Sequence, residues 1–72
     1  MPKWKEIKRF CENDGWEMYK ETDHYFFQKL DDTGILKRTK VSKGSHEVYG
    51  HLWEEILKKQ LQVSQEYFNK MI

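Results

Sequence analysis

Eleven aromatic residues in a chain of only 72 decide how this sequence can build a core. A chain of this length buries only about 60% of the surface that its unfolded form exposes, so one thin core is the most it can form. Aromatic rings bury the most apolar area per residue. The single cysteine, Cys11, excludes an internal disulfide, and no Cys/His spacing typical of a zinc site is present. We therefore expect one domain over residues 1–72 with an aromatic core, no metal and no cofactor.

The charge balance excludes a strongly basic protein. The chain has thirteen Lys and Arg residues and twelve Asp and Glu residues, which gives a net charge of +1. Any role in nucleic-acid binding must therefore depend on local clusters of cations. The most apolar stretch, residues 25–27, is far too short to span a membrane, and the first residues lack the apolar core of a signal peptide. We expect a cytoplasmic protein without a membrane role.

Apolar residues recur with a helical period near both ends of the chain. Residues 3–13 and 51–61 each predict an amphipathic helix, since charged side chains occupy the other faces. A short last helix follows, which Ser64 can cap. The apolar positions are Trp4, Ile7, Phe10 and Cys11 in the first helix; Leu52, Ile56, Leu57 and Leu61 in the second, with Trp53 beside them; and Tyr67, Phe68 and Met71 in the last.

The middle of the chain predicts a sheet. Residues 16–21, 24–30 and 35–42 alternate or are rich in aromatic and β-branched residues, which is typical of strands. Residues 31–34 predict a type I turn with glycine last, and residues 43–49 a polar loop. The order α-β-β-β-α with an extra helix predicts an α+β two-layer sandwich, with both main helices on one face of an antiparallel sheet. The other face would meet solvent or a partner.

Alternation along the second and third strands divides their side chains between two faces. A slip of one residue would exchange the faces. The residues that we expect beneath the helices are Tyr25, Phe27, Thr39 and Val41. The residues that we expect on the open face are His24, Phe26, Gln28, Arg38 and Lys40. Such a mixture of rings and cations suits single-stranded RNA, because bases stack on rings and phosphates pair with cations.

Five blocks of sequence follow one another in a known order. They are Asp14-Gly15-Trp16 after the first helix, Asp23-His24-Tyr25-Phe26-Phe27 at the second strand, LKRTKVS at 36–42, LWEEILKKQL at 52–61 and VSQEYF at 63–68. In order and spacing they resemble the HicA family of small toxins from bacterial toxin–antitoxin pairs. The resemblance covers nearly the whole chain.

The resemblance implies a fold like that of a double-stranded-RNA-binding domain. It implies a metal-independent endoribonuclease, an mRNA interferase that cuts messenger RNA and blocks translation. His24 matches the catalytic histidine of the family's second strand. A HicB-like antitoxin is the implied protein partner, and we expect the chain to be a monomer when free.

Histidine also suits metal-free RNA cleavage on chemical grounds. The reaction needs a base for the 2′-hydroxyl proton and a donor for the leaving oxygen, and an unperturbed pKa of about 6.5 allows histidine to serve as both. Cations must offset the charge that develops on the phosphorane. The candidate catalytic residue is therefore His24, and the candidate RNA-binding residues are Phe26, Gln28, Arg38, Lys40 and Lys43.

Two positions depart from the pattern of the family. Lys43 stands where one subgroup has a second histidine, which His46 is a candidate to replace. Asp23 precedes His24, where it could orient the imidazole or repel phosphate. The alternatives are a domain of the same fold that binds RNA without cutting it, and a protein-interaction domain that pairs through a free strand edge or the aromatic face.

Overall fold

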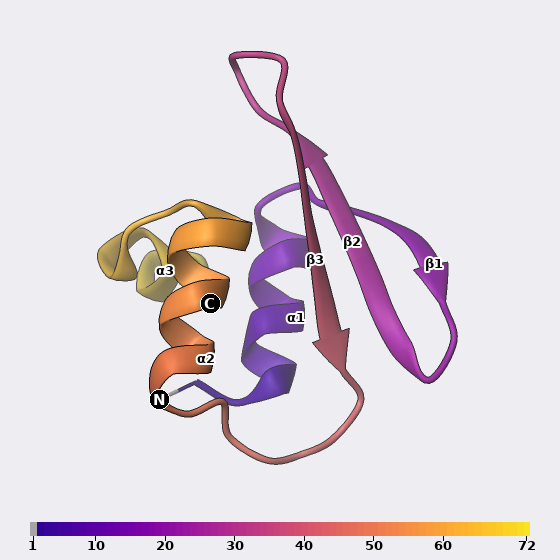
Figure 1. Ribbon diagram of the computed structural model, residues 1–72, viewed down its shortest axis with the longest axis vertical. Helices are drawn as coiled ribbons and strands as arrows, with labels where there is room; N and C mark the ends of the chain where they lie inside the picture. Colours follow the sequence, from indigo (N-terminus) through magenta and orange to yellow (C-terminus); the bar gives the residue numbers. More distant parts are fainter. Residues whose placement is uncertain (1) are drawn as a thin grey trace.

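The computed structural model describes residues 2–72 (Figure 1). Its elements are α1 (Trp4–Asn13), β1 (Glu17–Glu21), β2 (His24–Leu30), β3 (Leu36–Ser42), α2 (Gly50–Glu55), the π-helical segment η1 (Ile56–Leu61) and α3 (Gln65–Met71). The strands form one antiparallel sheet in the order β1-β2-β3. The chain is a small α+β domain, in which a helix and three antiparallel strands precede the remaining helices, as the sequence predicts. Within residues 2–72, no helix has the length and apolar character needed to cross a membrane.

The helices lie on one side of the sheet, with α1 beside β3 and β1 farthest from them (Figure 1). Tyr25 pairs with Val41, and Phe27 with Thr39, so the four side chains share a face. Phe27, Thr39 and Val41 are buried, and Tyr25 packs against the core that they help to form. The predicted division of the two strands between faces is therefore confirmed. All of β1, by contrast, is exposed.

Helix α1 ends in a glycine cap. The backbone N–H of Asp14 bonds to the carbonyl of Phe10, and Gly15 has φ +82°, in the left-handed region that favours glycine. The next N–H, of Trp16, returns to the carbonyl of Cys11 at 2.9 Å. This reversal places the Trp16 ring in the core, where only 6% of the residue is exposed.

The second main helix differs from the prediction. Leu52, expected in the core, is 50% exposed, whereas Trp53 is 5% exposed and its indole N–H donates to Gln65 Oε1 at 3.0 Å. The prediction assumed 3.6 residues per turn from residue 51 to 61. The buried face instead runs from Trp53 through Ile56 and Leu57 to Leu61, and the turns from Ile56 onward follow the wider π-helical pattern.

Residues 43–49, expected to be a polar loop, are tied to the N-terminal segment. Val48 is buried, and its N–H bonds to the carbonyl of Pro2 at 2.8 Å. Trp4 Nε1 donates to His46 Nε2 at 2.9 Å. The loop therefore fixes the start of α1 against the entry to α2.

Candidate nucleic-acid interface

The face of the sheet away from the helices carries the predicted site. Across β2 and β3, His24 pairs with Ser42, Phe26 with Lys40 and Gln28 with Arg38. Residues directly opposite each other in a sheet point to the same side. We call this surface the open face; it is defined by His24, Phe26, Gln28, Arg38 and Lys40. The structure thus brings five of the six predicted site residues together.

Strand β1 adds a ring and a cation that the sequence analysis missed. The pairing of β1 with β2 is irregular between Met18 and Lys20, and this β-bulge places Tyr19 beside Phe26, with ring centroids 6.2 Å apart. The Arg38 guanidinium lies 5.6 Å from the Tyr19 ring, and Lys20 Nζ lies 5.3 Å from the Phe26 ring. Cations and rings therefore alternate across all three strands. Strict alternation along β1 gives no sign of the bulge.

His24 lies at the end of β2 and lines a cavity of about 270 Å³ between the open face and the helices. The imidazole is half-buried. Its Nδ1 is buried and has no hydrogen-bond partner among the described residues, whereas Nε2 is not among the buried unpaired atoms. The cavity, hereafter the His24 cavity, is lined by Trp4, His24, Lys40, Ser42, Leu52, Ile56 and Gln60. A buried polar atom without a partner is costly in a folded protein, so the position of Nδ1 is a feature to be explained.

Hydrogen-bond donors surround this cavity. Lys40 forms no ion pair with any described residue. Ser42 Oγ accepts from the backbone N–H of Gly44 at 3.1 Å, which leaves its own O–H for another partner. Gln60 Oε1 accepts from Thr39 Oγ1 at 2.7 Å, which leaves the Gln60 amide N–H groups.

A second hollow, of about 280 Å³, adjoins the His24 cavity. It is lined by Tyr19, Phe26, Arg38, Thr39, Lys40 and Gln60. Lys40 and Gln60 line both hollows, so the two hollows adjoin at these side chains. We call the second one the ring hollow.

Lys43 does not join the open face. Its ammonium pairs with Glu21 at 2.9 Å and lies 5.0 Å from the ring of Tyr25, a residue of the opposite face. The hydrogen bond to Glu21 raises the pKa of Lys43. The prediction that Lys43 lies with the other RNA-binding residues is therefore wrong. Lys43 follows Ser42 directly, so its side chain points to the opposite side of the sheet.

His46 does not provide a free second imidazole for His24. The Nε2 of His46 is already the acceptor for Trp4. Asp23 Oδ1 accepts from Thr22 Oγ1 at 3.0 Å, and among the described residues it makes no hydrogen bond to His24. That bond from Thr22 holds the pKa of Asp23 below its usual value, with smaller contributions from the charges of His24 and Lys40. Asp23 therefore adds a negative charge near the imidazole without orienting it.

Gln28 marks the far end of the open face. Its Nε2 donates to Glu17 Oε1 at 2.7 Å, so the amide is already engaged and a carboxylate lies beside it. Gln28 lies four residues along the strand from His24, which is about 13 Å at 3.3 Å per residue. The cationic and aromatic part of the face is thus the part nearer to His24.

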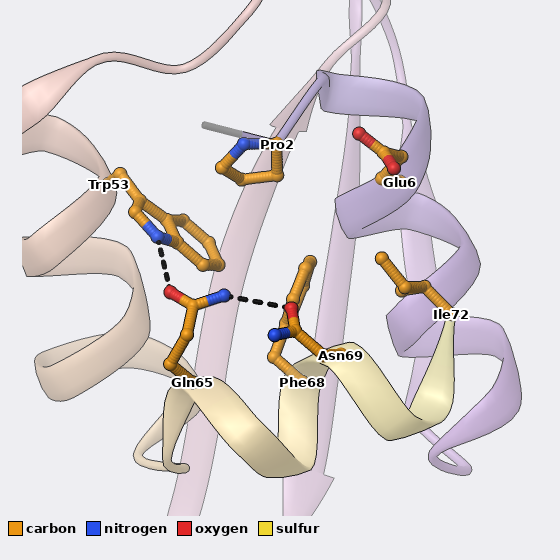
Figure 2. Close-up of a pocket in the computed structure, with 7 residues that line it drawn as sticks. All are labelled: Pro2, Glu6, Trp53, Gln65, Phe68, Asn69 and Ile72. Atoms are coloured by element: carbon orange, nitrogen blue, oxygen red, sulfur yellow. Dashed lines mark hydrogen bonds between the residues drawn. The ribbon is translucent and has the colours of Figure 1, made fainter.

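A cavity of about 520 Å³ lies elsewhere, between the N-terminal segment and α3 (Figure 2). Its polar side chains bond within the protein: Gln65 accepts from Trp53 and donates to Asn69 Oδ1 at 2.9 Å, and Glu6 accepts from the N–H of Lys3 at 2.8 Å. No strand residue lines it. It offers no unpaired acid, base or nucleophile comparable to His24.

Comparison with known proteins adds no relative: no protein-family model, curated protein or solved structure matches this chain. Within residues 2–72, no three His, Cys, Asp or Glu side chains are grouped in a way that could hold a metal ion. Function must therefore be inferred from the chemistry of the open face and the His24 cavity.

Proposed function

We propose that the chain is a HicA-like mRNA interferase with a fold like that of a double-stranded-RNA-binding domain. It binds messenger RNA as a single strand across the open face, in the cytoplasm, and cleaves it without a metal, with His24 as the general acid and base. A HicB-like antitoxin covers the same surface. The observation that carries the proposal is the half-buried imidazole of His24, which lines one cavity together with Lys40, a cation that forms no ion pair among the described residues.

Binding is supported by the charges of the open face. Three cations, Lys20, Arg38 and Lys40, lie around its two rings, although the whole chain carries a net charge of only +1. The acidic side chains nearby are partly occupied, since Glu17 bonds to Gln28 and Glu21 pairs with Lys43. Stacking of a base on an exposed ring contributes about 1–3 kcal/mol, and cations alongside attract the phosphates.

Cleavage is supported by the position of Lys40 relative to His24. Lys40 lies two residues before Ser42, the direct partner of His24, so it is a diagonal neighbour within reach of a long side chain. In the proposed reaction, neutral His24 takes the 2′-hydroxyl proton and the 2′ oxygen attacks phosphorus. The imidazolium then returns the proton to the departing 5′ oxygen, which leaves a 2′,3′-cyclic phosphate. Lys40 offsets the charge on the phosphorane.

The test compares wild type with His24→Ala during tightly controlled expression in a bacterial host. We expect arrest of growth by wild type and none by His24→Ala at equal soluble levels. His51→Ala is the matched control, because His51 is exposed on α2 and lines neither hollow of the site. It should remain as toxic as wild type. Full toxicity of His24→Ala would refute the proposed role of His24.

A second candidate function is RNA binding without cleavage. It is favoured by the hydrogen bond from Trp4 to His46, which occupies Nε2 of His46. His24 would then have to remove the 2′-hydroxyl proton and protonate the 5′ oxygen without help from a second imidazole. Three cations on the face predict a salt dependence with a slope of about −2 for single-stranded RNA. Salt-sensitive binding with no cleavage product would support this function over the first. Binding insensitive to salt would contradict both.

A further inference from the structure

The size and walls of the His24 cavity suit one planar ring. Its volume of about 270 Å³ is near the lower end of small-molecule pockets, which span roughly 300–1,000 Å³. Apolar walls come from Trp4 of α1 and from Leu52 and Ile56 of the second helical segment. Leu52 is half exposed because it forms the rim of this cavity instead of joining the core.

The polar groups of the cavity are mostly donors. Among residues 2–72, the Lys40 ammonium, the Ser42 hydroxyl and the Gln60 amide N–H groups have no partner, whereas Gln60 Oε1 and Ser42 Oγ already accept hydrogen bonds. The Trp4 indole N–H is also taken, by His46. A ligand with acceptors therefore fits better than one with donors. Uracil, like thymine, presents a carbonyl oxygen where adenine presents an amino group.

The two hollows adjoin at Lys40 and Gln60, so a strand with one base in each would place a phosphate at that junction. A base in the His24 cavity and the next base on the rings of Tyr19 and Phe26 would be joined across Lys40, which lines both hollows. His24 lies in the wall of the first hollow, beside that junction. The base in the cavity would therefore determine which phosphodiester bond meets the imidazole.

We propose that the His24 cavity is a nucleobase pocket that selects uracil over adenine in a single strand and so determines the position of cleavage. This inference rests on the proposed function. Leu52 and Ile56 hold the ring from one side and Trp4 from the other, and Gln60 reads a carbonyl oxygen. His24, whose buried Nδ1 has no hydrogen-bond partner among the described residues, lines the same cavity.

The experiment uses two non-cleavable pentanucleotides, of 2′-deoxyuridine and of 2′-deoxyadenosine, titrated into the ¹⁵N-labelled protein. The readouts are the indole N–H of Trp4 and the side-chain amide of Gln60. We expect both signals to shift with the deoxyuridine pentamer, and its binding to be about tenfold tighter, because one hydrogen bond is worth roughly that factor.

Two variants test the pocket itself. Gln60→Met keeps the length of the side chain and removes the amide, so the preference for deoxyuridine should fall to about twofold or less while both pentamers still bind. Leu52→Ala opens the rim and should weaken deoxyuridine binding. Leu30→Ala is the matched control, because Leu30 is an exposed leucine outside both hollows, and it should bind like wild type. Circular dichroism checks that each variant is folded.

The outcomes separate this inference from the proposed function. Equal affinity for the two pentamers would overturn the selection of uracil. Shifts at Phe26 and Arg38 with none at Trp4 and Gln60 would overturn the pocket and leave RNA binding by the open face intact. Failure of both pentamers to bind at low salt would overturn the proposed function together with the pocket.

Discussion

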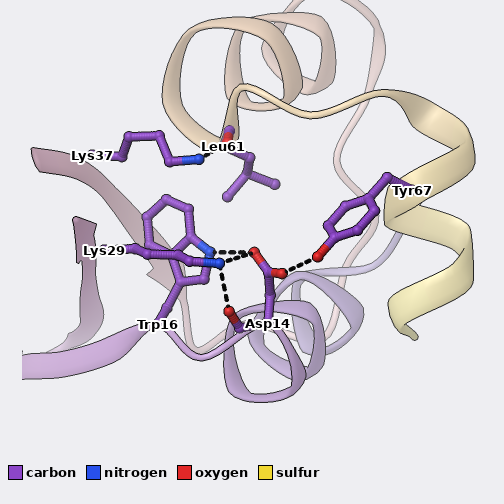
Figure 3. Close-up of polar contacts among 6 residues, drawn as sticks. All are labelled: Asp14, Trp16, Lys29, Lys37, Leu61 and Tyr67. Carbon is purple, nitrogen blue, oxygen red and sulfur yellow. Dashed lines mark hydrogen bonds and ion pairs between the residues drawn. The ribbon is translucent and has the colours of Figure 1, made fainter. Parts of the chain in front are cut away.

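Asp14 is the residue that connects most elements of the fold. Its carboxylate accepts hydrogen bonds from Trp16 Nε1 at 3.0 Å, from Lys29 Nζ at 3.1 Å and from the hydroxyl of Tyr67 (Figure 3). Only 4% of the Asp14 side chain is exposed. Burial alone would raise the pKa of Asp14, but the hydrogen bonds from Tyr67, Lys29 and Trp16 outweigh it and hold the pKa below its usual value. The end of α1 is thereby joined to β2 and α3.

Replacing this carboxylate tests its contribution to stability. Asp14→Asn removes the charge and leaves one of the three donors without a good acceptor, so the free energy of unfolding should fall by about 1–3 kcal/mol at pH 7. Because the pKa of Asp14 is lowered in the fold, its stabilising effect is present above the unfolded value of about 3.9 and is lost as pH falls through the folded value. Urea unfolding at several pH values measures both effects.

The matched control for this change is Asp32→Asn. Asp32 is exposed in the turn between β2 and β3, so its replacement should leave stability unchanged at every pH. The difference between wild type and Asp14→Asn should shrink below pH 4. A difference that stays constant down to pH 2.5 would show that the charge of Asp14 does not contribute.

At the scale of elements, the loop from β3 to α2 is fixed through one side-chain bond. His46 Nε2 accepts from the Trp4 indole, and the two rings lie edge to face at 6.2 Å. A Cβ at Gly44 would lie 2.6 Å from His46 Cε1, so the absence of a side chain at Gly44 makes room for the imidazole. The loop and the start of α1 therefore depend on each other.

Loss of this bond should weaken the fold measurably. We expect His46→Ala to lower the free energy of unfolding by about 1 kcal/mol, the usual net value of one hydrogen bond. His51→Ala, on the exposed side of α2, should change it little. In a double-mutant cycle, His46→Ala should cost much less in the Trp4→Phe background, since the donor is already gone. Equal costs in the two backgrounds would contradict the role of the bond.

The segment η1 ends in a backbone conformation that its residue does not favour. Gln62 has φ +58°, in the left-handed region, directly after η1. Such a position is normally glycine, because a Cβ is strained there. Gln62→Gly should therefore raise the free energy of unfolding by roughly 0.5 kcal/mol, the relief of strain less the added freedom of the unfolded chain. Thermal unfolding measures this change in stability. Lys59→Gly is the control with the opposite expected sign, because a glycine inside the helix should lower the free energy of unfolding by about 1 kcal/mol.

Periodicity predicts strands β2 and β3 but neither the bulge in β1 nor the site. His24–Leu30 was predicted to the residue, and the two faces of β2 followed from the alternation of Phe26 and Phe27, because strand geometry leaves only two directions. The cavity wall was not predictable. Helical spacing predicts Leu52 on the buried face, but Trp53 takes that place and Leu52 lies at the rim of the cavity, and the π-helical turns that follow leave no mark in a pattern of apolar residues.

At the scale of the whole molecule, a net charge of +1 conceals an uneven distribution. The four ion pairs among the described residues involve none of the five residues of the open face: they are Asp14 with Lys29, Glu12 with Lys8, Glu21 with Lys43 and Glu55 with Lys59. Among the described residues, Lys20, Arg38 and Lys40 form no ion pair. The potential of a surface depends on such unpaired charges more than on the total.

Lys40 tests whether this local charge governs RNA binding. Lys40→Met keeps the length of the side chain and removes the cation that lines both hollows, so affinity for single-stranded RNA should fall at low salt. The slope of log affinity against log salt should become about 0.7 shallower, the value for one lost phosphate contact. Lys58→Met lowers the net charge equally, but Lys58 lies on the exposed side of η1 outside both hollows, so its slope should match wild type. If Lys40→Met and Lys58→Met lose the same affinity for RNA and show the same salt slope, the total charge of the chain controls binding and the open face does not.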